Sequence, residues 1–199
     1  MNLQSVAFRA FALALAVLTS ACTTTTTQSF NVTKNPRVEA SVIAVDADFG
    51  RYDRIFANDM GIFFPADAAP SDTDQERIRQ IFRRAFLGEL VDYEIVRSKG
   101  PTALEVQATL IDLRQATSPE VPGMRRELRE IARPGSIIFL MELKDSKSGK
   151  ILGRAADSAS APTFSTSTET ITDWGPVEDA AARWARLFRE FLDVNMNKQ

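Results

Sequence analysis

The chain has 199 residues, of which 44% are hydrophobic and 25% are charged, and its formal net charge is −2 with no histidine. This composition is that of a globular protein and excludes collagenous, largely disordered and polytopic membrane proteins. The nearly neutral charge gives no field suited to binding nucleic acid, and the length predicts one domain with short appendages.

The segment 1–21 has the layout of a secretory signal peptide. A single charge, Arg9, precedes an apolar stretch from Ala10 to Leu18, and small residues follow up to Ala21. A positive region, a short apolar region and a small-residue cleavage site define such signals. The apolar stretch is shorter than the about 20 residues that a spanning helix needs, so we expect the segment to be removed rather than retained as an anchor.

Cys22 is the only cysteine of the chain and directly follows this signal. A nucleophilic thiol needs a neighbouring base, and a structural cysteine would lie in an apolar segment, whereas five threonines follow Cys22. Ser20 and Ala21 before it resemble the lipobox of bacterial lipoproteins. The resemblance implies that Cys22 carries lipid and that Thr23, which is not aspartate, directs the protein to the outer membrane. The alternative is cleavage by the ordinary signal peptidase, which leaves a soluble periplasmic protein with a free thiol.

The segment 22–36 is polar and of low complexity. It is predicted to be a flexible tether, because it has too little apolar surface to offset the entropy lost on ordering. The remaining residues, 37–199, are predicted to form a single α+β domain.

Two elements are predicted in the first half of this domain. Residues 54–64 are rich in aromatic and branched side chains and indicate a strand that ends at Pro65. Residues 71–90 indicate a helix whose start Ser71 or Asp72 can cap. Its apolar residues recur at helical spacing on one face: Ile78, Ile81, Phe82, Ala85, Phe86 and Leu90.

The middle of the chain indicates a sheet. Residues 102–115 alternate between apolar and polar as a half-buried strand does, and a shift of the alternation near the end predicts a bulge or a twist. The unbroken apolar run of residues 136–143 predicts a central strand, joined through turn-forming residues to a second strand as a hairpin. Residues 121–135 predict a short surface helix with an excess of arginine. Contact of that helix with anionic lipid headgroups is the alternative.

Residues 172–194 indicate the last helix. Pro176 suits its first turn, and Glu178 and Asp179 favour the positive end of the helix dipole. One apolar stripe runs along it, made of Val177, Ala181, Trp184, Phe188 and Phe191. Two helices that are apolar on one face must cover a sheet. The sequence therefore predicts a two-layer α+β fold, with a mostly antiparallel sheet of four to five strands and two main amphipathic helices on one face.

No catalytic motif is present in the sequence. With no histidine and an acylated Cys22, cysteine and Ser–His–Asp nucleophiles are excluded, and neither a metal nor a cofactor is expected. Carboxylates such as Asp46, Asp48, Asp59 and Glu142 could form the pair that glycoside hydrolysis needs, but the sequence does not give their separation. We therefore expect a protein that is not an enzyme.

Three stretches of the chain match the pattern of a known family, namely "DADFGRYDRIFANDMGIFF", "LIDLRQA" and "WGPVEDAAARWARLF". They resemble a family of bacterial lipoproteins catalogued as domain of unknown function number thirty-three thirteen. The matching positions are Tyr52, Asp112, Arg114, Trp174, Gly175, Glu178, Asp179 and Trp184. The resemblance implies export, lipidation and an α+β body, and it brings no catalytic residues.

These features predict a lipid-anchored envelope protein at the inner leaflet of the outer membrane, facing the periplasm. It would be a non-enzymatic binding or structural module, with the membrane and an envelope protein as partners and an undetermined oligomeric state. Two alternatives remain, a periplasmic hydrolase that uses carboxylates and a carrier of an apolar ligand between helices and sheet. A large apolar cavity would favour the carrier, whereas dense packing there would count against it.

Overall fold

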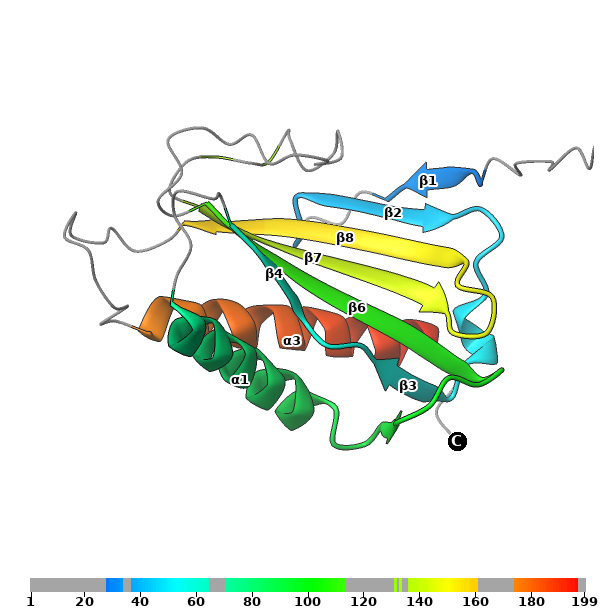
Figure 1. Cartoon of the computed structure of the whole chain (residues 1–199). Coiled ribbons are helices and arrows are strands. Elements are labelled where there is room, and N and C mark those ends of the chain that lie inside the picture. Colours follow the sequence, from blue (N-terminus) through cyan, green and yellow to red (C-terminus); the bar gives the residue numbers. More distant parts are fainter. Residues whose placement is uncertain are drawn as a thin grey trace, which may run out of the picture.

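The computed structural model describes residues 28–33, 37–64, 71–113, 131, 133, 136–160 and 174–196. In these ranges one sheet carries two long helices on one of its faces (Figure 1). The elements are β1 (Phe30–Val32), β2 (Ala40–Ala44), η1 (Phe49–Arg51), β3 (Arg54–Ala57), β4 (Gly61–Phe63), α1 (Asp72–Glu89), β5 (Glu94–Val96), β6 (Ala103–Asp112), β7 (Ser136–Asp145), β8 (Ile151–Ser160) and α3 (Gly175–Asn195). This is the two-layer α+β class that the sequence predicts.

The sheet is larger and more mixed than the sequence predicts. Within the described residues it has eight strands in the order β1-β2-β8-β7-β6-β3-β5, and β4 also pairs with β6. The pairs from β1 through to β6 are antiparallel, whereas β3 and β4 run parallel to β6, and β5 runs parallel to β3. The predicted number of four to five strands is therefore wrong, and the sheet is mixed, with four antiparallel and three parallel pairs among the described strands. Helix α1 carries the chain from the end of β4 back to the end of the sheet where β3 begins, so the strands before and after this helix run parallel.

The predicted strand 54–64 is two strands, β3 and β4, along the same edge of β6. Ala57 pairs with Val106, and Gly61 pairs with Thr109. The segment from 57 to 61 therefore has one residue more than the segment of β6 from 106 to 109 that it faces. The extra residue is a bulge that interrupts the pairing.

Both helices have the extent and the buried face that the sequence predicts. Ser71 caps α1, since its hydroxyl oxygen accepts a hydrogen bond from the backbone N–H of Asp74 at 3.1 Å. Trp174 is the residue before α3 and makes no side-chain cap, while Pro176 lies in the first turn. The two helices pack against each other as well as against the sheet.

The main core lies between the helices and the sheet. Phe139 of β7 stacks on Trp184 of α3 with ring centroids 4.6 Å apart, and on Phe82 of α1 with centroids 5.6 Å apart. Aromatic rings from three elements therefore join the two layers, as the apolar stripes of the helices require.

A second, smaller core on the opposite face explains the shifted alternation in β6. Ile111 and Leu113 pack there with Ile131, Ile138 and Ala156. The pairing of β6 with β7 continues in one register from Leu104 to Asp112, so of the predicted bulge or twist the bulge is absent from this pairing. The last residues of β6 are apolar on both sides because both faces of the sheet are covered at that end.

Several predicted features fall outside the described residues. They include the signal peptide, Cys22, Thr23, Arg114 and the helix 121–135, of which only Ile131 and Arg133 are described. Strand β1 lies inside the segment 22–36 that was assigned to the tether, so the ordered body begins before residue 37. Among the described residues, no helix combines the length and the hydrophobicity needed to cross a membrane.

Candidate functional site

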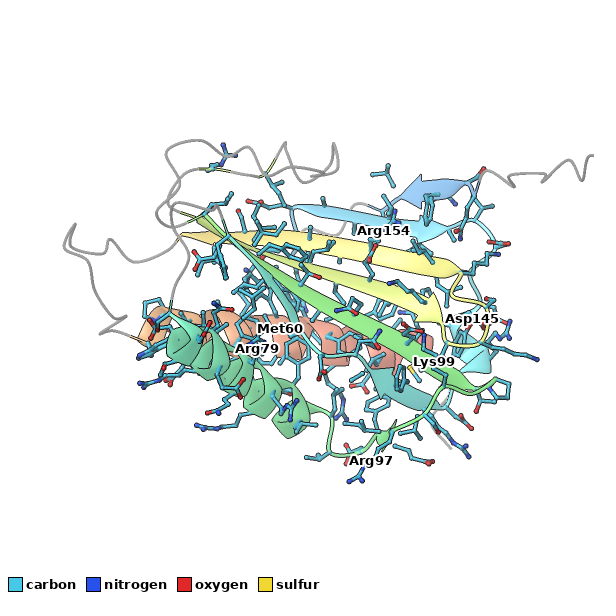
Figure 2. The ribbon with its side chains drawn as sticks, viewed as in Figure 1. Met60, Arg79, Arg97, Lys99, Asp145 and Arg154 are labelled. Carbon is cyan, nitrogen blue, oxygen red and sulfur yellow. The ribbon has the colours of Figure 1, made fainter. Side chains whose placement is uncertain are left out.

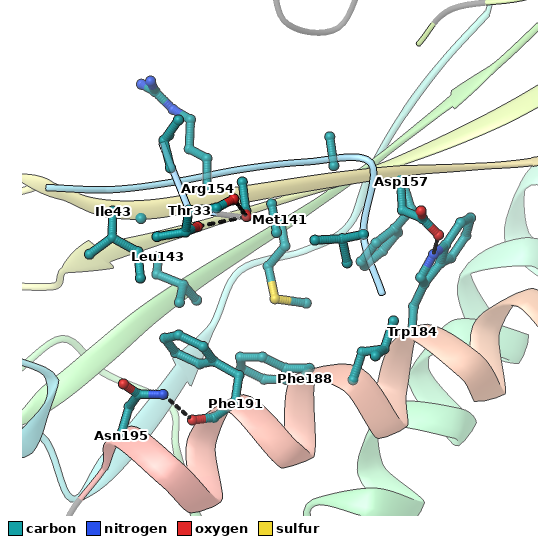
Figure 3. Close-up of a pocket in the computed structure, with 18 of the residues that line it drawn as sticks. Thr33, Ile43, Met141, Leu143, Arg154, Asp157, Trp184, Phe188, Phe191 and Asn195 are labelled. Carbon is teal, nitrogen blue, oxygen red and sulfur yellow. Dashed lines mark hydrogen bonds between the residues drawn. The ribbon is translucent and has the colours of Figure 1, made fainter. Parts of the chain in front are cut away.

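An apolar pocket of about 240 Å³ lies between the sheet and the C-terminal half of α3 (Figure 3). Strands β2, β7 and β8 form one wall, α3 forms the opposite wall, and Phe49 of η1 lies at one end. The apolar side chains that line it are Val38, Ile43, Phe49, Phe139, Met141, Leu143, Trp184, Leu187, Phe188 and Phe191. This pocket lies between helix and sheet, which is where the carrier alternative would place its ligand.

The pocket exists because the strand positions that face α3 carry small side chains. Side chains alternate between the two faces of a strand, and Asp157 of β8 points toward α3, where it contacts Trp184. Gly153 and Ala155 lie on the same face of β8, and their partners on β2 are Ile43 and Ser41. Glycine, alanine and serine do not reach the helix, so a volume remains between the two layers.

A buried carboxylate fixes the end of the pocket near Trp184. Asp157 is 4% exposed, and its Oδ2 accepts a hydrogen bond from the indole Nε1 of Trp184 at 2.9 Å. The same oxygen also accepts from Arg183, and the backbone N–H of Glu39 donates to Oδ1 at 3.3 Å. Sequence spacing suggests that Arg183 pairs with Asp179, but its guanidinium reaches across to β8 instead. Asp157 thus links β8, α3 and the start of β2.

The opposite end of the pocket is closed by aromatic rings. Phe49 and Phe191 meet edge to face with centroids 5.0 Å apart. The side-chain amide of Asn195 donates to the carbonyl oxygen of Phe191 at 2.8 Å. The polar side chains of the lining that face α3 or the β1–β2 connection are hydrogen bonded to other protein groups; these are Thr33, Ser41, Asp157 and Asn195. The pocket therefore offers a guest apolar contact and little hydrogen bonding.

A second buried carboxylate secures the β7–β8 hairpin to η1. Asp145, which is labelled in Figure 2, receives hydrogen bonds from the backbone and the hydroxyl of Ser148, both at 2.7 Å, and from the hydroxyl of Tyr52 at 2.8 Å. Burial alone would raise the pKa of Asp145, but these bonds and the charge of Arg51 lower it to about 2. Burial, and then the bond to Asp145, raises the pKa of Tyr52. Tyr52 is therefore a neutral donor to a carboxylate.

Charged side chains on the face of the sheet away from the helices neutralise one another. Glu105 lies 2.6 Å from Lys99, and Glu142 lies 2.7 Å from Arg154 and 3.5 Å from Lys144. Burial would raise the pKa of Glu105, but hydrogen bonds from Lys99 and Asn58 lower it. A general acid needs a raised carboxyl pKa, and each carboxyl group with a displaced pKa in the described residues is lowered.

A shallow hollow between the N-terminal ends of α1 and α3 gathers three further acids. Asp72, Glu76 and Glu178 line it together with Arg77 and Arg84. All five side chains are exposed. A carboxyl group becomes a general acid at neutral pH through desolvation, which an exposed position does not provide. The hollow therefore gives little support to hydrolysis.

The residues that carry the family resemblance are spread over the fold. Trp174 is buried at the start of α3, and the guanidinium of Arg77 lies 4.5 Å from the centroid of its ring. Gly175, Glu178 and Asp179 follow in the first turns and are exposed. These four matching residues thus surround one helix start and do not form a cleft of their own.

The other matching residues occupy separate places. Tyr52 lies at the hairpin, Asp112 is buried at the end of β6, and Trp184 lies in the wall of the pocket. Asp157, which orders this wall, was not among the predicted site residues. The signal that would have found it is the stretch "ILGRAADSASA", where small residues surround one acid in a strand.

Taken together, these features define a two-layer α+β protein with an apolar pocket between its sheet and α3. The family model described as "Protein of unknown function (DUF3313)" matches residues 28–188, and the chain belongs to this family. No curated protein matches the chain.

Three solved structures illustrate the likeness of the fold. The PelC dodecamer from Paraburkholderia phytofirmans is 10% identical, with 87% of this chain and 100% of that chain covered and a TM-score of 0.39. A DUF4136 family protein from Bacteroides thetaiotaomicron is 16% identical over 82% and 97% of the two chains, with a TM-score of 0.38. A DUF330 protein from Xanthomonas campestris is 13% identical over 84% and 94%, with a TM-score of 0.40.

Proposed function

We propose that this protein is a non-enzymatic binding module that holds an apolar group in the pocket between β2, β8 and α3. The pocket of about 240 Å³ is the observation that carries the proposal. An engineered apolar cavity of about 150 Å³ binds benzene, and pockets for drug-sized ligands begin at about 300 Å³. The size of the pocket thus suits one narrow hydrocarbon group.

The chemistry of the lining supports a hydrocarbon. The polar side chains of the lining are engaged within the protein, so a polar guest would lose its hydrogen bonds to water without replacement. A methylene group gains about 0.8 kcal/mol on burial. The apolar part of an amphiphile would therefore enter, and its polar part would stay at the mouth.

We further propose that the module is anchored at the periplasmic side of the outer membrane through lipid on Cys22, with Thr23 as the sorting residue. The signal-like segment, the lipobox resemblance and the family membership support this location. An envelope protein that delivers or accepts the apolar group is the proposed partner. Hydrolysis is the less supported function, because the buried carboxylates are paired with cations or hydrogen-bond donors.

The proposal is tested by filling the pocket. Ala155 lines the pocket and is half-buried, and Ala155→Leu adds three carbon atoms there. Ala40→Leu is the matched control, because Ala40 is also half-buried but pairs with Ala156 on the other face of the sheet. A fluorescent fatty-acid analogue is titrated into each purified protein, and urea unfolding verifies that each variant is folded.

The wild-type protein and Ala40→Leu are expected to bind one equivalent of the analogue, and Ala155→Leu is expected to bind at least tenfold more weakly. Absence of saturable binding to the wild-type protein would overturn the proposal. Equal affinity of the wild-type protein and Ala155→Leu would place the binding elsewhere and overturn it as well.

A further inference from the structure

We infer that the guest of the pocket is an acyl chain of the protein's own lipid on Cys22. The inference rests on the proposed function and identifies the ligand. It is carried by the place where the described chain begins, by the length of chain between that place and Cys22, and by the size of the pocket.

The described chain begins beside the pocket. The side-chain amide of Gln28 donates to the carbonyl oxygen of Ile151 in β8. Gly153, two residues further along this strand, lines the pocket, and two residues of a strand span about 7 Å. Thr33 and Val38, which lie on either side of the β1–β2 connection, also line it. The N-terminal segment is thus held against the wall of the pocket.

The chain between Cys22 and Gln28 is long enough to bring a lipid to the mouth. Six residue steps separate the two positions, and fully extended they span at most about 21 Å. This reach is about three times the distance of about 7 Å along β8 from the anchored residue to the pocket. An acyl group on Cys22 therefore reaches the pocket without any change in the sheet.

Tethering favours this guest over lipids in solution. A group on a short flexible linker has an effective concentration in the millimolar range at its site. The volume of about 240 Å³ accepts one narrow chain but not two. Any further acyl chain of the same lipid remains available to a bilayer. A single acyl chain gives only marginal membrane binding. By holding or releasing one acyl chain, the pocket would therefore control how firmly the protein is attached to the bilayer.

The test uses the fact that Cys22 is the only cysteine of the chain. The full chain, purified without lipid, is alkylated at Cys22 with N-hexadecylmaleimide or, as the matched control, with N-ethylmaleimide. A third sample carries the hexadecyl group at the opposite edge of the sheet, in the double variant Cys22→Ser, Glu94→Cys. Glu94 lies on β5, six strand spacings or about 29 Å from β1. Binding of the fluorescent fatty-acid analogue is then measured in all three.

The ethylated chain and the Glu94→Cys sample are expected to bind the analogue, and the chain with hexadecyl on Cys22 is expected to bind it at least tenfold more weakly at every protein concentration. Equal binding in all three samples would overturn the inference and leave the proposed function intact. If the weaker binding is seen only at high protein concentration and is gone after dilution, the hexadecyl group of one molecule occupies the pocket of another. That result would also overturn the inference. Absence of binding to the ethylated chain would overturn the proposed function itself.

Discussion

Replacing Tyr52 with phenylalanine removes one hydrogen bond from a buried carboxylate and leaves the aromatic ring in place. Tyr52 is 1% exposed and Asp145 is 6% exposed, so water does not replace the lost donor. Hydrogen bonds to charged groups contribute about 1.5–3 kcal/mol. Asp145 keeps both bonds from Ser148 and the charge of Arg51 at 3.3 Å. We expect Tyr52→Phe to lower the free energy of unfolding by about 2 kcal/mol at pH 7.

The effect should depend on pH in a defined direction. The pKa of Asp145 is about 2 in the folded protein and 3.8 ordinarily, so on acidification the unfolded state binds this proton first. The carboxylate therefore stabilises the fold fully above its ordinary pKa, and this contribution is lost as the pH falls from about 4 through 2. In Tyr52→Phe the pKa of Asp145 lies closer to its ordinary value. The difference between the wild-type protein and the variant should shrink over this interval.

Urea unfolding at pH 7 and at pH 2.5 measures both quantities. Tyr93→Phe is the matched control, because the Tyr93 hydroxyl donates at 2.7 Å to Asp193, a carboxylate whose side chain is 39% exposed and which Arg189 also contacts. We expect a loss of about 1 kcal/mol there. An equal loss in the two variants, or a loss in Tyr52→Phe that is the same at both pH values, would refute the reasoning.

Two further predictions concern the pocket wall and the anchor. Trp184→Phe keeps an aromatic ring on Phe139 but removes the N–H donor to Asp157, and it should lower the free energy of unfolding by about 1–2 kcal/mol; unchanged urea unfolding would contradict this. Cys22→Ser should accumulate as an unprocessed, unacylated precursor, which the mass of the intact protein reports. Ordinary cleavage of this variant would rule out lipid attachment at Cys22.

The helices could be predicted because they are long and periodic. In α1 the capping residue Ser71 and the recurrence of Ile78 and Phe82 indicate both the start and the buried face. In α3 the same holds for Val177 and Trp184. Local spacing suffices for such elements, since a helix makes its backbone hydrogen bonds within its own segment.

The sheet could be predicted only in part, because strand pairing is not local. Strands β1, β4 and β5 have three residues each, which is too short for an alternation to be recognised. The direction of pairing depends on how α1 returns the chain, which no residue pattern in β3 or β6 records. The residues that line the pocket could not be predicted for a related reason, since the pocket depends on side chains that are small at Ser41, Gly153 and Ala155 and on the helix that faces them.

The empty volume between sheet and helix lowers the stability of the fold, and the proposed ligand binding depends on the same volume. An unfilled cavity costs about 24 cal/mol per Å³, which for about 240 Å³ is about 6 kcal/mol as an upper bound for this partly open space. At Gly153 a β-carbon would be in van der Waals contact with the carbonyl oxygen of Val42 at 3.4 Å and with Phe49 at 3.5 Å. Ser41 and Ala155, which already carry a β-carbon, line the pocket as well. A library selected for heat resistance alone should therefore accumulate larger residues at these two positions, and its most robust members should be the ones that no longer hold a ligand.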